Sequence, residues 1–183
     1  PDDGVITLVD ALGRRWRRDH TPGEINLLWA TGKVLPGVDY TAEFEAAARA
    51  SARSTNGNPL DMRAGTILLP SCDVLLRNAF VRDPGLVLRG VSNGVSRIVG
   101  DSAITMTVHP VRGDGTPYTN TGYGGLFMYD CQLHAISDAA RTSGVGLLMI
   151  NCFNTQFTNL YVSGFFINIL LRGSHFAQFR NFY

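Results

Sequence analysis

A block of seven residues recurs along the second half of the chain. Residues 125–131 (GLFMYDC) return after 21 positions as residues 146–152 (GLLMINC), and a looser copy at 168–174 (NILLRGS) follows 22 positions later. The tails of the last two copies also align, since 157–161 (FTNLY) matches 179–183 (FRNFY). A fixed period in this range is typical of solenoids, whose repeats stack because none can bury its apolar face alone.

Short apolar segments bounded by Gly, Asn, Asp or Ser precede these copies, at residues 65–70, 74–76, 85–90 and 97–100. Three such strands per coil, each pairing in parallel with the next coil, would form a right-handed parallel β-helix. We therefore expect an all-β solenoid with coils of about 20–22 residues.

The first part of the chain has a different pattern. Residues 5–9 and 14–19 predict two short strands around a turn, and so a β-hairpin. A helix is predicted from about residue 41 to residue 53, after N-cap candidates at 39–41. Its apolar side holds Phe44, Ala47, Ala48 and Ser51 at helical spacing. We expect this face to cover the open end of the first coil.

Four segments, in this order and spacing, resemble the pectate-lyase-like β-helix superfamily in the form found in bacteriophage tailspikes: 9–18, 25–30, 38–47 and 65–70. Two departures are Tyr40, in place of a second aspartate, and residues 33–37, where the family often has Gly-Asp-Gly. The resemblance implies an N-terminal hairpin or connector segment over 1–37. It also implies a capping helix and first coils over 38–183, truncated at the C-terminus.

The net charge and the hydropathy of the chain limit the classes of partner that we expect it to bind. The formal net charge of +1 gives no global field for nucleic acid, and no apolar run reaches the length of a membrane-spanning helix. No signal peptide is visible, so we expect a soluble chain with no membrane insertion. Residues 14–18 (RRWRR) could bind nucleic acid, but a two-faced strand explains the same pattern. We expect no nucleic-acid partner.

The three cysteines do not form a disulfide framework. Cys131 and Cys152 occupy equivalent positions in the repeat, which predicts a buried, reduced stack of the two thiols. Cys72 has no matching partner. Asp130 aligns with Asn151 and Asp138 with Asn159, so we expect both aspartates to bond the local backbone at coil bends.

Catalytic chemistry is hard to find in this pattern. A glycosidase generally needs two carboxylates flanking the scissile bond, and the aspartates after residue 101 show no pairing. The four histidines have no zinc-ligand spacing, and no cluster of oxygen ligands suggests calcium. We predict no catalytic residue, metal or cofactor within the chain.

One stretch, residues 102–124, interrupts the period and predicts a loop inserted between coils. Its candidate ligand-binding residues are Arg112, Asp114, Tyr118 and Tyr123, with the tyrosines as sugar-stacking platforms or as ordinary loop packing. A carbohydrate-binding module is therefore one open interpretation.

The resemblance implies a structural and attachment component of a phage or phage-like particle, the proximal part of a spike or fibre. It implies a homotrimer located in the virion, contacts with other virion proteins through 1–37, and bacterial surface polysaccharide bound by a missing distal region. The alternative is a polysaccharide depolymerase, a hydrolase or lyase, whose active site lies in distal coils.

Overall fold

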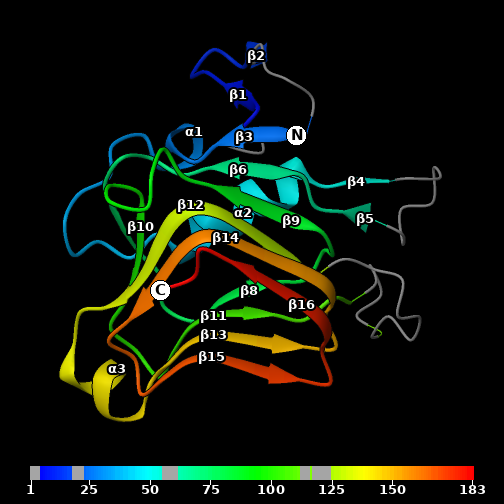
Figure 1. The fold of residues 1–183 in the computed structure, drawn as a ribbon. Coiled ribbons are helices and arrows are strands. Elements are labelled where there is room, and N and C mark those ends of the chain that lie inside the picture. Colours follow the sequence, from blue (N-terminus) through cyan, green and yellow to red (C-terminus); the bar gives the residue numbers. More distant parts are fainter. Residues whose placement is uncertain (1–4, 18–22, 55–61, 112–115, 117–124) are drawn as a thin grey trace.

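The computed structural model describes residues 5–17, 23–54, 62–111, 116 and 125–183 (Figure 1). Its largest element is an eight-stranded sheet in which the strands pair in parallel. The order along the main path is β16 (His175–Arg180), β14 (Phe153–Ser163), β12 (Leu126–Ala135), β9 (Leu86–Arg89), β6 (Thr66–Leu68) and β3 (Glu24–Asn26).

The long strand β12 makes this sheet curl. Its first half pairs with β9, whereas its second half pairs with β10 (Arg97–Gly100), which in turn pairs with β7 (Asp73–Leu75). Between the two halves lies Asp130 with a φ of 55°, in the left-handed region that aspartate and asparagine adopt more readily than most residues. The sheet therefore turns a corner around the core.

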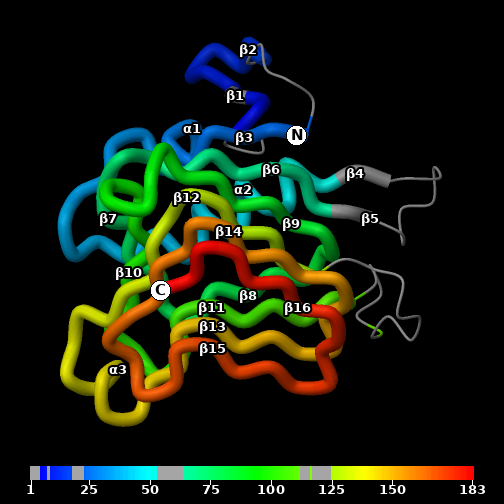
Figure 2. The backbone as a smooth tube through the Cα atoms, viewed as in Figure 1, coloured from blue at the N-terminus to red at the C-terminus, as the bar shows by residue number. Residues whose placement is uncertain are grey.

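A second parallel sheet faces the first, with the order β15 (Ile167–Arg172), β13 (Val145–Ile150), β11 (Ile104–Val108) and β8 (Ala79–Val81). Between the sheets, apolar side chains stack strand upon strand. One such column runs through five residues that are each 0% exposed: Ile25, Ile67, Leu88, Met128 and Phe157. The continuous backbone tube in Figure 2 shows these layers rising from β15 and β16 towards β3.

Helix α2 (Thr41–Ser51) packs against β3, β6 and β8. Its buried residues are Phe44, Ala47, Ala48 and Ser51, as the helical spacing predicts. The Ser51 hydroxyl donates to the Ala48 carbonyl and accepts the Gly65 N–H, which ties the end of the helix to the start of β6. The predicted apolar face of this helix is thus confirmed.

The remaining elements are short. The predicted hairpin is confirmed as the antiparallel pair β1 (Thr7–Val9) and β2 (Arg15–Arg17), and a second antiparallel pair is formed by β4 (Arg53–Ser54) and β5 (Met62–Arg63). Helix α1 (Leu28–Thr31) follows β3, and α3 (Asp138–Ser143) follows β12. No helix in the described ranges is long and apolar enough to span a membrane.

The prediction of an all-β, right-handed parallel β-helix with regular coils is wrong. The chain forms an α/β-type arrangement, 47% strand and 14% helix, in which parallel sheets curl into a half-barrel. The spacing between paired strands is not constant: Ile25 pairs with Ile67, Ile67 with Leu88, Leu88 with Met128, and Met128 with Phe157. Connections of unequal length, including those that hold α2 and α3, account for this variation.

The sequence repeat also predicts the wrong partners at its first step. Residues 127–131 pair with 156–160 of β14, not with residues 148–152, which lie in and just after β13 of the second sheet. Cys131 therefore lies opposite Leu160, and the predicted stack of Cys131 on Cys152 is wrong. Both thiols are free and buried, as predicted, while Cys72 is partly exposed. The later offset of 22 is confirmed, because Phe157 pairs with Phe179 and Leu147 with Ile169.

The predicted alignments of Asp130 with Asn151 and of Asp138 with Asn159 are also wrong. Asp130 contacts Asn159 rather than lying opposite Asn151, since the Asn159 side-chain amide donates to the Asp130 carboxylate at 2.7 Å. Asp138 lies in the first turn of α3 with a fully solvated side chain. The Ser137 hydroxyl, not an aspartate, accepts the capping hydrogen bond from the Ala140 N–H.

Candidate functional site

The four ligand-binding candidates from the sequence, Arg112, Asp114, Tyr118 and Tyr123, lie outside the described residues. The candidate site described below therefore consists of other side chains.

The outer face of the large sheet carries two rows of side chains that the sequence analysis missed. Along each strand, every second residue points outward, because its neighbour belongs to the buried column. The strand register places these outward residues in line across the six strands from β3 to β16. One row holds Asn26, Leu68, Arg89, Tyr129, Thr158 and Arg180, and the other holds Glu24, Thr66, Val87, Phe127, Gln156 and Gln178.

Contacts within and between the two rows hold the central side chains in place. The Arg89 guanidinium lies 5.9 Å from the centre of the Tyr129 ring, a cation–π arrangement. The Tyr129 hydroxyl donates to Gln156 Oε1 at 3.4 Å, and Gln156 Nε2 donates to Thr158 Oγ1 at 3.3 Å. Neither Arg89 nor Arg180 forms an ion pair with another described residue. The centre of the face therefore presents an aromatic ring between guanidinium, amide and hydroxyl groups.

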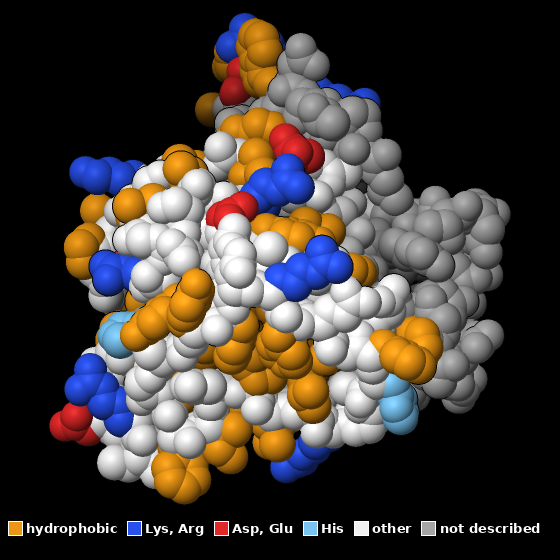
Figure 3. Space-filling view, viewed as in Figure 1, with side chains coloured by type: hydrophobic (Ala, Val, Ile, Leu, Met, Phe, Trp, Pro, Cys, Tyr) orange, Lys and Arg blue, Asp and Glu red, His pale blue; other side chains and the backbone are white. Residues whose placement is uncertain are grey.

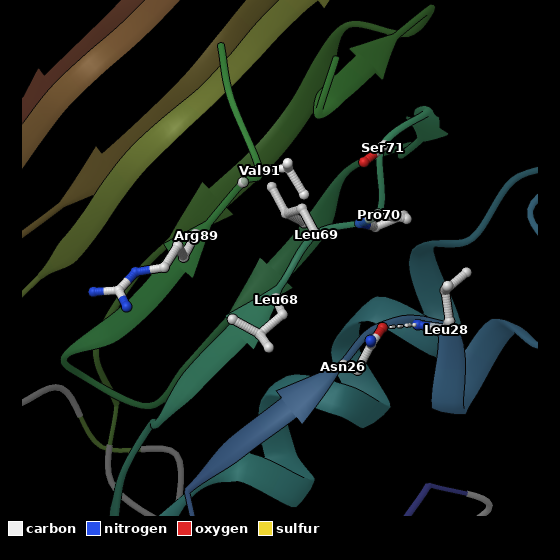
Figure 4. A pocket seen from close by; sticks show the side chains of 9 residues that line it. Asn26, Leu28, Leu68, Leu69, Pro70, Ser71, Arg89 and Val91 are labelled. Atoms are coloured by element: carbon white, nitrogen blue, oxygen red, sulfur yellow. Dashed lines mark hydrogen bonds between the residues drawn. The ribbon is translucent and has the colours of Figure 1, made fainter. Parts of the chain in front are cut away.

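A groove of about 480 Å³ adjoins this face at the carboxyl ends of β3, β6 and β9. Figure 4 shows Leu68 and Leu69 along the strand that forms its floor, with Asn26 and Leu28 on one side and Arg89 and Val91 on the other. Asn26 Oδ1 accepts the Leu28 N–H at 3.0 Å, which leaves the amide nitrogen as a donor. The volume lies in the range of ligand-binding clefts, and ligands of open parallel sheets commonly bind beyond the carboxyl ends of the strands.

A second exposed surface lies at the opposite edge of the molecule, and we call it the apolar edge. It consists of large side chains on or after β15 and β16 that are 38–71% exposed: Leu171, Phe176, Phe179, Phe182 and Tyr183. Phe179 stacks on the buried Phe157 with ring centres 5.2 Å apart, and Phe182 packs edge-on against Phe179 at 5.0 Å. Hydrophobic side chains gather in the centre of the face that Figure 3 shows. A contiguous apolar surface of this kind commonly marks an interaction site.

Other reactive groups are spread through the fold. His134 Nδ1 lies 2.8 Å from the Ser163 hydroxyl on the second half of β12 and β14. Burial raises the pKa of the Cys131 and Cys152 thiols to about 12, so both stay protonated and poorly nucleophilic near neutral pH. Among the described residues, no group of three His, Cys, Asp or Glu side chains could hold a metal ion.

Comparison of the chain with known protein families, with curated proteins and with solved structures gave no match. The resemblance to the pectate-lyase-like superfamily inferred from four segments is therefore corrected: the half-barrel arrangement contradicts it, and no family match supports it.

Proposed function

We propose that this chain is a structural and attachment component of a larger assembly, which binds a surface polysaccharide through the outer face of its large sheet. The spike or fibre of a phage-like particle, with bacterial polysaccharide as the ligand, is the setting in which such a component would work. The observation that carries the proposal is the pair of rows in which Arg89, Tyr129, Gln156 and Thr158 contact one another.

The chemistry of the rows suits an extended, hydroxyl-rich ligand. Guanidinium, amide and hydroxyl groups provide donors and acceptors for sugar hydroxyls, whereas the Tyr129 ring provides an apolar surface with a polar tip. These groups recur on successive strands, which lie about 4.8 Å apart, so a chain-like ligand can make similar contacts along its length. The adjoining groove would hold one end of that ligand or a branch from it.

The apolar edge also supports the proposed attachment function. A surface of exposed phenylalanines at the edge of a sheet favours association with other strands or other subunits. In a homotrimeric particle component, such an association would hold the sheet faces of several copies close together. Several weak sugar sites would then act as one strong site, because the second binding event becomes intramolecular.

The experiment is a binding measurement with the full chain on purified bacterial capsular polysaccharides and lipopolysaccharides. We expect saturable binding that weakens about tenfold in Tyr129→Ala and in Arg89→Gln, since each substitution removes a central contact. Arg141→Gln is the matched control, because Arg141 is an exposed arginine on α3. Binding that is the same in all three variants would exclude the outer face as the site.

The same experiment distinguishes the depolymerase alternative. Release of new reducing ends or of unsaturated sugar ends during incubation would identify hydrolysis or elimination rather than attachment alone. Polysaccharide that is bound and recovered intact supports the attachment function.

A further inference from the structure

The groove at the carboxyl ends of β3, β6 and β9 combines an apolar lining with a single charged side chain (Figure 4). Five of its nine lining residues are apolar: Leu28, Leu68, Leu69, Pro70 and Val91. Leu28 is 37% exposed and Val91 is 70% exposed, so part of this apolar lining is open to a ligand. Arg89 is the one charged residue among the nine. Ligand pockets commonly have this composition, in which apolar groups hold the body of the ligand and a few polar groups orient it.

The polar side chains of the groove offer more hydrogen-bond donors than acceptors. The Arg89 side chain lies on the Tyr129 ring but forms no ion pair or hydrogen bond with another described residue. The amide nitrogen of Asn26 remains a donor, because Oδ1 accepts the Leu28 N–H, and the exposed Ser71 hydroxyl can also donate. A carboxylate suits these donors, since it only accepts and its two oxygens match the fork of one guanidinium.

The protein supplies no carboxylate to Arg89 from the described residues around it. None of the lining residues is acidic. Asp130 follows Tyr129 on β12, but its carboxylate accepts the Asn159 amide at 2.7 Å and forms no ion pair with a described residue. Glu24 lies at the start of β3, whereas the groove lies beyond the end of that strand. An acidic ligand would therefore supply the charge that Arg89 lacks.

The groove is continuous with the outer face of the large sheet. Asn26, Leu68 and Arg89 belong both to the groove and to the first row of outward side chains. A sugar chain that lies along this row can therefore place its end or a branch in the groove. A free fatty acid would use the apolar lining and Arg89, but it would leave the amide and hydroxyl groups of the row without partners.

We propose that the groove binds a sugar unit that carries both a carboxylate and a methyl-bearing substituent. The carboxylate contacts Arg89, and the methyl group packs on the apolar lining. This inference rests on the proposed function, since the sugar unit would be the end or a branch of the polysaccharide that lies along the rows. It narrows the ligand to acidic polysaccharides with such a substituent.

The test is a calorimetric titration of the full chain with four small probes: N-acetylmuramate, N-acetylglucosamine, glucuronate and octanoate. N-acetylmuramate differs from N-acetylglucosamine by a lactyl group, which adds one carboxylate and one methyl group. Glucuronate has the carboxylate without that methyl group, and octanoate has a carboxylate and an apolar chain without a sugar. We expect N-acetylmuramate to bind at least about tenfold more tightly than N-acetylglucosamine, with glucuronate between them.

Two variants separate the charged and apolar contacts. Arg89→Gln should lower the affinity for N-acetylmuramate to that for N-acetylglucosamine. Val91→Ser should weaken N-acetylmuramate binding about threefold and leave glucuronate binding unchanged, because only the methyl contact is lost. Arg141→Gln and Val95→Ser are the matched controls, since both residues are exposed and lie outside the groove. The melting temperature of each variant shows whether the fold is kept.

Equal binding of N-acetylmuramate and N-acetylglucosamine, tighter binding of octanoate, or no binding of N-acetylmuramate would each overturn this inference. None of these results decides the proposed function, which depends on polysaccharide binding and on its loss in Tyr129→Ala. Conversely, polysaccharide binding that persists in Tyr129→Ala counts against the outer face, whereas the monosaccharides still report on the groove.

Discussion

Three residues, two within neighbouring strands of the large sheet and one just after the next strand, share the same left-handed backbone conformation. Asp130, Asn159 and Asn181 have φ angles of 55°, 51° and 48°. Their side chains form a ladder, in which Asn181 donates to Asn159 Oδ1 at 2.8 Å and Asn159 donates to the Asp130 carboxylate at 2.7 Å. The corner is thus held both by residue types that tolerate the left-handed region and by hydrogen bonds that run across the strands.

Substitutions of Asn159 separate these two contributions. Asn159→Gly loses both ladder hydrogen bonds but keeps a residue suited to positive φ, whereas Asn159→Ala loses both advantages. We expect Asn159→Ala to lower the free energy of unfolding by about 2–4 kcal/mol, and Asn159→Gly by about 1 kcal/mol less than that. Urea denaturation followed by circular dichroism measures both values. An equal loss in the two variants would show that backbone strain plays no part.

The buried thiols give stability a dependence on alkaline pH. Burial raises the pKa of Cys131 and Cys152 from 9.0 to about 12, so unfolded chains release these protons at lower pH than folded ones. Their contribution to stability is complete below pH 9 and is lost as the pH rises from 9 towards 12. We expect each thiol to steepen the loss by up to about 1.4 kcal/mol per pH unit in that window.

The double variant Cys131→Ala, Cys152→Ala is the comparison for this effect. Its free energy of unfolding should be lower near neutral pH, where two packed side chains are lost, but should fall less steeply above pH 9. Parallel curves for the two proteins would mean that the thiols do not ionise differently in the folded and unfolded chains.

At the scale of single elements, local patterns predicted the structure where the interactions are local. Helix α2 and the β1–β2 hairpin follow from spacing and turn residues within a few positions. Pairing between distant strands was predicted only where no helix intervenes, as between β14 and β16. The similarity of residues 125–131 to 146–152 reflects two strands with the same alternation of buried side chains. It does not identify partners, because α3 and the corner at Asp130 send the second strand into the other sheet.

The two rows of the outer face could be predicted from the sequence only in part. Alternating outward residues such as Val87 and Arg89, or Phe127 and Tyr129, are visible in the sequence as a period of two. Which of them become neighbours depends on strand pairs that begin up to 42 residues apart, as Glu24 and Thr66 do. Only the register brings Arg89, Tyr129 and Thr158 into one row.

Helix α2 offers a test of how an element is held in place. Phe44 is 0% exposed and faces the sheets, so Phe44→Ala should lower the free energy of unfolding by about 3–5 kcal/mol through lost burial and a cavity. Glu43→Gln, one residue away on the partly exposed side, should change it by less than about 1 kcal/mol. Chemical denaturation of both variants is the measurement. A loss of similar size in the two would mean that α2 is not anchored by its apolar face.

At the scale of the whole molecule, we expect self-association to occur through the apolar edge. The exposed rings of Phe179 and Phe182 should bind the dye ANS and promote concentration-dependent self-association. Replacing both with serine should reduce dye fluorescence and shift sedimentation towards smaller species. Phe166→Ser is the matched control, since Phe166 is 65% exposed but lies outside this edge. Unchanged association in the double variant would locate the contact elsewhere.

The order of strands in the large sheet also has a mechanical consequence. The hairpin lies beyond β3 at one end of the stack, and β16 lies at the other, so a pull between them acts along the backbone hydrogen bonds rather than along the strands. Bonds loaded in that direction open one strand at a time, whereas bonds loaded in shear must break together. Under tension the molecule would therefore lengthen in steps, with β16 leaving first and the core around α2 holding longest.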